Sequence, residues 1–210
     1  MKPPDLSRLL ALRAQTQSSS QELAGYRERF QRIAQRHENG TAPRAVVAHQ
    51  LFQTPAELAA RLVALLPAFE GLSVLEPSAG LGRLLDALKP GKPGEVVAVE
   101  FAAACVVELH RRDDLAAVHY GDFLQMQPGV LGMFDRIATN PPFTQRSDIK
   151  HILHARRFLM PGGTIAALCM DTHHRETALR PLAATWEKIP AGAFKESNTG
   201  VPTVLLTIKG

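Results

Sequence analysis

Cysteine is scarce in this sequence: only Cys105 and Cys169 occur among 210 residues. Two cysteines are too few for a metal cluster and allow one disulfide at most, and both lie in apolar runs that favour buried free thiols. The adjacent pair His173-His174 has no third ligand at a suitable spacing, and neighbouring side chains point apart. We therefore expect no metal site and no disulfide framework.

Long apolar runs are absent as well. None approaches the roughly 18 residues that a membrane-spanning helix needs. Residues 1–5 lack the apolar run and cleavage site of a signal peptide. These absences predict a cytoplasmic protein without a membrane partner.

Charge imbalance is small and unevenly placed. The chain carries 24 Lys and Arg against 20 Asp and Glu, a net charge of +4. Residues 1–50 hold eight of the basic and four of the acidic side chains, so the whole surplus lies in that segment. A composition of 45% hydrophobic and 21% charged residues excludes a disordered or collagen-like chain. The length predicts one domain, residues 50–210, preceded by a basic arm, residues 1–49.

The arm is predicted to be helical. Leu23, Tyr26, Phe30 and Ile33 are spaced three or four residues apart, which gives a helix with a narrow apolar stripe between arginines. This pattern allows three interpretations: the arm grips nucleic acid, packs on the protein's own core, or joins two copies in a homodimer.

Strands and helices alternate from residue 50 onward. The short apolar runs at residues 74–75 and 96–99 indicate strands buried on both faces. Alternation predicts a mostly parallel, doubly wound sheet, and the last two strands lack an intervening helix, so they should form an antiparallel hairpin. The predicted strands are residues 72–76, 95–100, 117–121, 134–139, 164–170, 186–190 and 203–209, with helices at 83–88, 102–112, 147–159 and 175–185. A further helix is expected to begin at a capping box formed by residues 54–57.

Three successive strand ends carry polar or glycine-rich motifs. Gly80 and Gly82 let the backbone approach a ligand closely as the first strand turns into a helix. Glu100 ends the second strand, where a carboxylate can accept hydrogen bonds from both ribose hydroxyls. Asp122 and Phe123 follow the third strand and suit an exocyclic amine and a purine face. Each motif alone is also compatible with an ordinary turn or a solvated strand end, but their order favours a nucleoside ligand.

The strongest motif is Asn140-Pro141-Pro142-Phe143, directly after a predicted strand. The two prolines stiffen the backbone and remove competing N–H donors. The Asn140 side-chain oxygen and the Pro141 carbonyl can then converge on one amino group, while the Phe143 ring lies against a planar base.

Together these motifs resemble class I S-adenosylmethionine-dependent methyltransferases, and the DNA adenine-N6 methyltransferases in particular, over about residues 50–210. The resemblance implies a Rossmann-like seven-stranded α/β fold and S-adenosylmethionine as cofactor. Asn140, Pro141, Pro142 and Phe143 match the catalytic tetrapeptide of that family. The residues that match its cofactor-binding positions are Thr54, Pro55, Glu76, Pro77, Ser78, Ala79, Gly80, Gly82, Glu100, Asp122 and Phe123. The order of motifs is similar to the gamma arrangement.

Substrate contacts are expected at two further places besides Phe143. Phe194 and Lys195 precede the last strand, where the family places a second aromatic beside the target base, although Phe194 also suits plain hairpin packing. Arg146 and Lys150, with His154 and Arg157, form a basic stripe on the helix after the tetrapeptide, and the buried side of that helix is predicted to consist of Ile149, Ile152, Leu153 and Leu159. This stripe suits phosphates, or is simply the solvated outer face of a helix.

The resemblance implies methyl transfer to the adenine N6 of nucleic acid, with DNA preferred over RNA. No segment remains for a separate target-recognition domain, so the arm, short loops or a protein partner must read the target, or the substrate is structured RNA. The alternatives are an RNA adenine-N6 methyltransferase, a protein glutamine-N5 methyltransferase, which shares the tetrapeptide, and a non-catalytic nucleic-acid-binding module with a retained cofactor fold.

Overall fold

The computed structural model describes residues 54–192 and 201–210. The arm predicted for residues 1–49 lies outside these ranges, as do Phe194 and Lys195. None of the helices in the described ranges is both long enough and apolar enough to cross a membrane.

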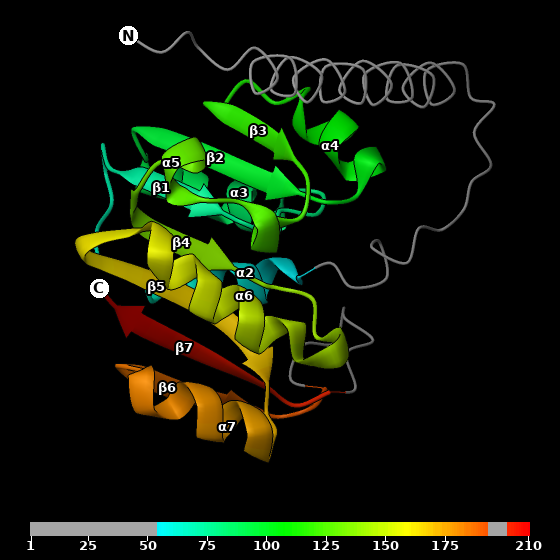
Figure 1. Ribbon diagram of the computed structural model, residues 1–210, viewed down its shortest axis with the longest axis vertical. Helices are drawn as coiled ribbons and strands as arrows, with labels where there is room; N and C mark the ends of the chain where they lie inside the picture. The colour runs from blue at the N-terminus through cyan, green and yellow to red at the C-terminus, as the bar shows by residue number, and fades with distance from the viewer. Residues whose placement is uncertain (1–53, 193–200) are drawn as a thin grey trace, which may run out of the picture. The chain divides into compact units, whose positions relative to one another are not determined.

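A seven-stranded sheet forms the centre of the described residues, with the strand order β3-β2-β1-β4-β5-β7-β6 (Figure 1). The strands β1 to β5 pair in parallel, whereas β7 is antiparallel to both β5 and β6. The predicted C-terminal hairpin is therefore confirmed. The strands are β1 (Ser73–Glu76), β2 (Glu95–Glu100), β3 (Ala117–Tyr120), β4 (Phe134–Thr139), β5 (Leu159–Met170), β6 (Thr185–Ile189) and β7 (Thr203–Lys209).

Helices cover both faces of this sheet. Figure 1 shows α5, α6 and α7 on the face toward the viewer and α2 and α3 behind the sheet. The helices are α2 (Ala56–Ala64), α3 (Arg83–Leu88), α4 (Ala103–Leu109), α5 (Pro128–Leu131), α6 (Ser147–Ala155) and α7 (His173–Leu179). Short 3₁₀ turns follow α3, α6 and α7 at Lys89–Gly91, Arg156–Phe158 and Arg180–Leu182.

The alternation of side chains along the strands explains the two layers. In β1, Val74 packs with the α2 and α3 leucines, while Leu75 packs with the cluster around Ile152 of α6. Successive strand side chains point to opposite faces, so a strand covered on both sides is apolar at every position. This explains the uninterrupted apolar runs in the sequence.

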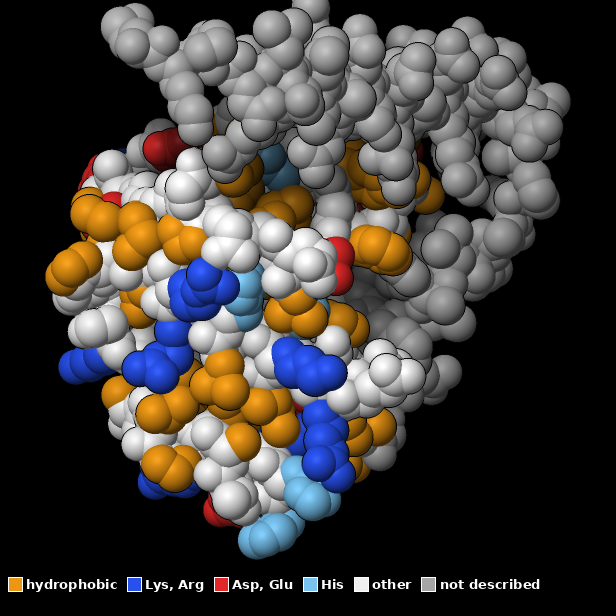
Figure 2. Space-filling model, viewed as in Figure 1, with side chains coloured by type: hydrophobic (Ala, Val, Ile, Leu, Met, Phe, Trp, Pro, Cys, Tyr) orange, Lys and Arg blue, Asp and Glu red, His pale blue; other side chains and the backbone are white. Residues whose placement is uncertain are grey.

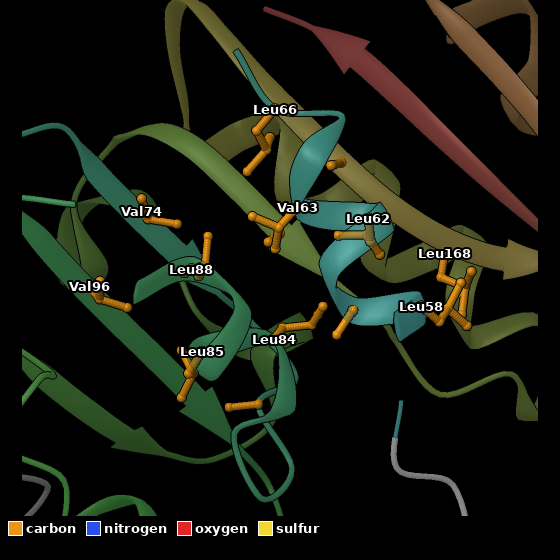
Figure 3. Packing of buried hydrophobic residues seen from close by; sticks show 14 of the residues in the cluster. Leu58, Leu62, Val63, Leu66, Val74, Leu84, Leu85, Leu88, Val96 and Leu168 are labelled. Carbon is orange, nitrogen blue, oxygen red and sulfur yellow. The ribbon is translucent and has the colours of Figure 1, made fainter. Parts of the chain in front are cut away.

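The face beneath α2 and α3 is closely packed (Figure 3). Leu62 and Val63 of α2 and Leu84 and Leu88 of α3 belong to one buried cluster with Val74 of β1, and Leu88 lies beside Val74. Burying one such side chain contributes about 1.5–3 kcal/mol. The start of α2, and with it Thr54, is thereby held at a fixed place on the sheet.

Both cysteines are free and buried, as predicted. Burial raises the pKa of Cys105 to about 11 and that of Cys169 to about 12. Both thiols therefore stay protonated at neutral pH and are poor nucleophiles.

Several element boundaries differ from the prediction. The strand β5 begins at Leu159 and not at residue 164 as predicted, because Leu159 pairs with Phe134 across an irregularity in the ladder. The helix α7 begins at His173 and ends before Pro181, which cannot continue a helix. The short helix α5 has no counterpart in the prediction.

The capping box predicted at residues 54–57 is wrong. The helix α2 begins at Ala56 after Pro55, and no side chain caps its first turn. The Thr54 hydroxyl instead accepts a hydrogen bond from the side chain of Asn140, as described below. A tertiary contact has taken the place of the local one.

Candidate active site

A cavity of about 390 Å³ opens at the carboxyl ends of β1 to β4. From β1 the chain adds β2 and β3 on one side, and it then adds β4 and β5 on the other side. The strand order therefore reverses next to β1, and open α/β sheets bind ligands where the order reverses. The volume lies in the range of about 300–1,000 Å³ typical of small-molecule sites. The cavity is lined by Pro77, Ser78, Gly80, Glu100, Phe101, Gly121, Asp122, Phe123, Asn140, Pro142 and His151.

The glycine turn after β1 is tied to the end of β2. Gly80 and Gly82 have φ of +54° and +87°, a left-handed backbone that favours glycine. A Cβ built on Gly80 meets nothing within 4 Å, so its side faces open space. The Glu100 carboxylate accepts hydrogen bonds from the Gly80 and Ala102 amides, each at 2.6 Å. Two bonds leave acceptor capacity on a carboxylate for further donors.

Aromatic side chains contribute to the same cavity in different ways. Phe123 is only 2% exposed, and its ring centre lies 4.9 Å from that of His154 and 5.0 Å from that of Phe158. It is therefore mainly a core residue with one edge on the cavity. Phe101, which the sequence analysis missed, is 68% exposed and lines the cavity directly after Glu100. The sequence offered one indication of this role, because Phe101 is an aromatic residue that directly follows the acid at the end of a strand.

Asp122 shapes the turn beneath the cavity. Its carboxylate accepts a hydrogen bond from the Leu124 amide at 2.9 Å and caps the 3₁₀ turn Phe123–Gln125. The position of Asp122 on the cavity wall is thereby fixed.

The tetrapeptide follows β4 as predicted. Asn140 Nδ2 donates a hydrogen bond of 2.8 Å to Thr54 Oγ1, which connects β4 to the start of α2. Pro141 is buried, Pro142 is exposed on the cavity rim, and Phe143 is partly buried against the α2–α3 cluster.

Unpartnered polar atoms concentrate at the ends of β1 and β4. Among the described residues, the buried side-chain atoms without a hydrogen-bond partner are both Glu76 oxygens, Thr139 Oγ1, Asn140 Oδ1 and Trp186 Nε1. All but the last lie at these two strand ends. Buried polar groups are normally paired, so a cluster of unpaired acceptors calls for a ligand that brings donors.

Glu76 is the most unusual of these groups. Its side chain is 1% exposed, and burial, followed by repulsion from Glu100, raises its pKa well above 4.5. A cationic donor would oppose both effects, because an opposite charge that pairs with the carboxylate favours its ionised form and lowers its pKa.

His151 also lines the cavity, although the sequence analysis passed over it. Its Nδ1 lies 3.3 Å from Ser78 Oγ, and burial lowers its pKa below the ordinary value of 6.5. The prediction assigned Leu153 to the buried side of α6, but Leu153 is 38% exposed, and Asp148, His151, Ile152 and Ala155 are buried.

The remaining predicted residues lie around the cavity rather than on it. Glu76, Ala79 and Gly82 belong to the strand and turn behind Pro77 and Ser78, and Pro55 precedes α2. Arg146 and Lys150 are exposed at the start and middle of α6. No group of three metal-ligating side chains is present in the part of the chain that the structure describes.

Comparison with solved structures identifies the class of fold. No protein-family profile matches the sequence, and no curated protein does. TrmN from Thermus thermophilus superimposes with a TM-score of 0.59 at 23% identity, over 74% of this chain and 49% of TrmN. A modification subunit of a candidate type I restriction enzyme from Vibrio vulnificus gives 0.61 at 15% identity, over 85% and 48%. The T. thermophilus 16S rRNA N2 G1207 methyltransferase RsmC, in complex with AdoMet and guanosine, gives 0.54 at 22%, over 75% and 43%.

The chain thus has the class I methyltransferase fold, as the sequence motifs implied. It spans about half the length of each of these three structures or less.

Proposed function

We propose that this chain transfers a methyl group from S-adenosylmethionine to the exocyclic N6 amino group of adenine in nucleic acid, with DNA preferred over RNA. The observation that carries the proposal is the cluster of unpartnered acceptors at the ends of β1 and β4. Both proposed ligands bring hydrogen-bond donors there: an ammonium group on the cofactor and an amino group on the base.

The residues at the strand ends fit the cofactor part by part. Glu100 accepts from the ribose hydroxyls, Asp122 from the adenine amine, and Glu76 pairs with the ammonium group of the methionine moiety. Phe101, on the cavity wall beside Glu100, offers an apolar surface to the adenine ring. S-adenosylmethionine supplies a methyl group bonded to a positively charged sulfur, which is the electrophile of the reaction.

Asn140 acts on the substrate amino group. The lone pair of an adenine amine is delocalised into the ring, so the nitrogen is a poor nucleophile. Asn140 Oδ1 and the Pro141 carbonyl accept hydrogen bonds from its two hydrogens, favour a pyramidal nitrogen and stabilise the positive charge that develops there. Thr54, bonded to Asn140 Nδ2, holds the amide in place. Asparagine is not a base, so the released proton passes to water.

The test is transfer of an isotopically labelled methyl group to DNA and RNA, followed by mass spectrometry of the nucleosides. We expect labelled N6-methyldeoxyadenosine from DNA, and a smaller amount of labelled N6-methyladenosine from RNA. Label found only on guanine, or only on a release-factor glutamine offered in parallel, would contradict adenine specificity. Cofactor binding without transfer to any substrate would favour the non-catalytic alternative.

The outer face of α6 supports a nucleic-acid substrate. Between residues 144 and 157, Arg146, Lys150, Arg156 and Arg157 are exposed, while the single acid, Asp148, is fully buried. Figure 2 shows Lys and Arg side chains over the face that α6 and α7 present, with few Asp or Glu side chains among them. This surface begins three residues after Phe143 and suits the phosphates that flank a flipped base.

Replacing Lys150 by glutamine should therefore weaken nucleic-acid binding about equally for all sequences. The logarithm of the association constant falls linearly with the logarithm of the salt concentration, and each lost phosphate contact should make this slope less steep by about 0.9 for duplex DNA. Fluorescence anisotropy across a salt series measures this slope. Lys209→Gln is the matched control, because Lys209 is exposed and pairs with Thr164 in the amino-terminal half of β5, away from the strand ends that form the cavity. Equal slopes for both variants and the wild type would exclude Lys150 from the interface.

A further inference from the structure

The segment after the tetrapeptide has an unusual backbone. Gln145 and Arg146 have φ of +52° and +59°, so two successive residues other than glycine adopt the left-handed conformation. Side chains with a Cβ rarely adopt it, because the Cβ crowds the backbone. Such a segment persists only where surrounding contacts hold it.

A buried ion pair provides these contacts. Arg175 of α7 is 7% exposed and Asp148 of α6 is fully buried. Arg175 Nε lies 3.0 Å from Asp148 Oδ2, and Nη2 lies 3.0 Å from Asp148 Oδ1. The planar guanidinium fits a carboxylate in this two-point manner, which fixes orientation as well as distance.

The same guanidinium also reaches the tetrapeptide. Arg175 Nη2 donates a hydrogen bond of 3.0 Å to the carbonyl of Phe143. Phe143 precedes the left-handed residues and Asp148 follows them, so one side chain holds both ends of residues 144–147.

Asp148 anchors this arrangement to the rest of the fold. Its Oδ2 accepts a hydrogen bond of 3.2 Å from the Met170 amide at the end of β5, and its Oδ1 one of 3.1 Å from the Ile149 amide. The end of β5, the start of α6, α7 and the tetrapeptide therefore meet at one ion pair. A buried ion pair adds little stability over well-packed apolar residues, so its value here lies in the geometry it imposes.

We propose that Arg175 is a positioning residue for the tetrapeptide, which it holds through the Phe143 carbonyl and Asp148. This inference rests on the proposed function, because the atoms it positions are those assigned to the target base. Arg175 touches neither the cavity nor Asn140 in the contacts described, so its effect should fall on the transfer step and not on cofactor binding.

The test is Arg175→Lys, which keeps the charge but cannot span Phe143 and Asp148 with a rigid fork. A displacement of about 1 Å in a reacting group can cost about 10²-fold in rate. We expect kcat to fall roughly 10- to 100-fold, while the cofactor Kd from calorimetry stays close to that of the wild type. Amide hydrogen exchange at residues 144–149 should become faster. Arg180→Lys, an exposed arginine after α7, is the matched control and should change none of these.

Asp148→Asn is the second variant, because it keeps the shape and one acceptor oxygen if Arg175→Lys does not fold. Unchanged kcat and unchanged exchange at residues 144–149 in a folded variant would overturn the proposal. A cofactor Kd that weakens in step with kcat would also overturn it, in favour of a general structural role. If the wild type transfers no methyl group to any substrate, the proposed function fails. In that case the hydrogen-exchange comparison by itself tests whether Arg175 holds residues 144–149 in place.

Discussion

Asn140→Ala should lower kcat for methyl transfer by about 10²–10³-fold, the usual effect of removing one group that stabilises developing charge. Asn140 Oδ1 is one of the unpartnered acceptors at the end of β4. In the proposed mechanism, alanine leaves the substrate amine with the Pro141 carbonyl alone. The cofactor Kd should change little, because the charged and apolar cofactor contacts proposed above, Glu76, Glu100, Phe101 and Asp122, follow or end β1, β2 and β3. Single-turnover transfer of labelled methyl groups, with calorimetry of cofactor binding, measures both quantities.

Asn140→Asp is the matched comparison for this variant. Aspartate keeps an acceptor at the same place, and the Thr54 hydroxyl, now 2.8 Å from an amide nitrogen, can donate to a carboxylate instead. We expect this variant to retain more activity than Asn140→Ala. Full transfer activity in Asn140→Ala would refute the assigned mechanism outright.

Glu76→Gln should weaken cofactor binding and stabilise the free protein. A hydrogen bond to a charged group contributes about 1.5–3 kcal/mol, so removing the negative charge should raise the cofactor Kd roughly 10- to 100-fold. In the free protein the carboxyl is buried without a partner among the described residues, and glutamine removes the cost of ionising it. Calorimetry and chemical denaturation report these opposite effects.

The pH dependence of stability gives an independent check on Glu76. The pKa of the carboxyl is raised on folding, above the value of 4.5 that applies to the exposed group. Its contribution is therefore fully present below pH 4.5 and is lost as the pH rises through the folded-state pKa. The wild type and Glu76→Gln should have similar stability at low pH and diverge above it, with the variant more stable. If the free energy of unfolding of the two proteins changed with pH in parallel, the raised pKa of Glu76 would be refuted. An unchanged cofactor Kd in Glu76→Gln would show that Glu76 is not part of the cofactor site.

The strand-end motifs could be predicted because they are local. Residues 76–82, Glu100, Asp122 and Asn140 each follow an apolar run, and parallel strands bring their carboxyl ends to one edge. The partners of those residues could not be predicted in this way. The Asn140–Thr54 bond joins residues 86 apart, and no local pattern marks it.

The rotation of α6 shows why periodicity failed at His151. The apolar pattern placed Leu153 inside, yet the left-handed residues Gln145 and Arg146 and the ion pair at Asp148 set how the helix meets the sheet. His151 and Asp148 are buried as a result. The ion pair between Asp148 and Arg175 determines which side of α6 is buried, at the expense of burying Leu153. Arg175 lies 27 residues from Asp148, so the local apolar pattern could not indicate this contact.

Among the described residues that line the cavity there are two carboxylates and no lysine or arginine, and a third carboxylate, Glu76, ends β1 next to the lining residue Pro77. Arg146 and Lys150 lie outside the cavity, on α6. In the proposed function, this separation of charge would select what enters the cavity. A nucleoside that carries a positive sulfur and an ammonium group would be attracted, whereas the phosphates of ATP, dinucleotides and free nucleotides would be repelled by the carboxylates. The phosphates of a nucleic acid would stay on the basic helix, while only an uncharged base would pass inward.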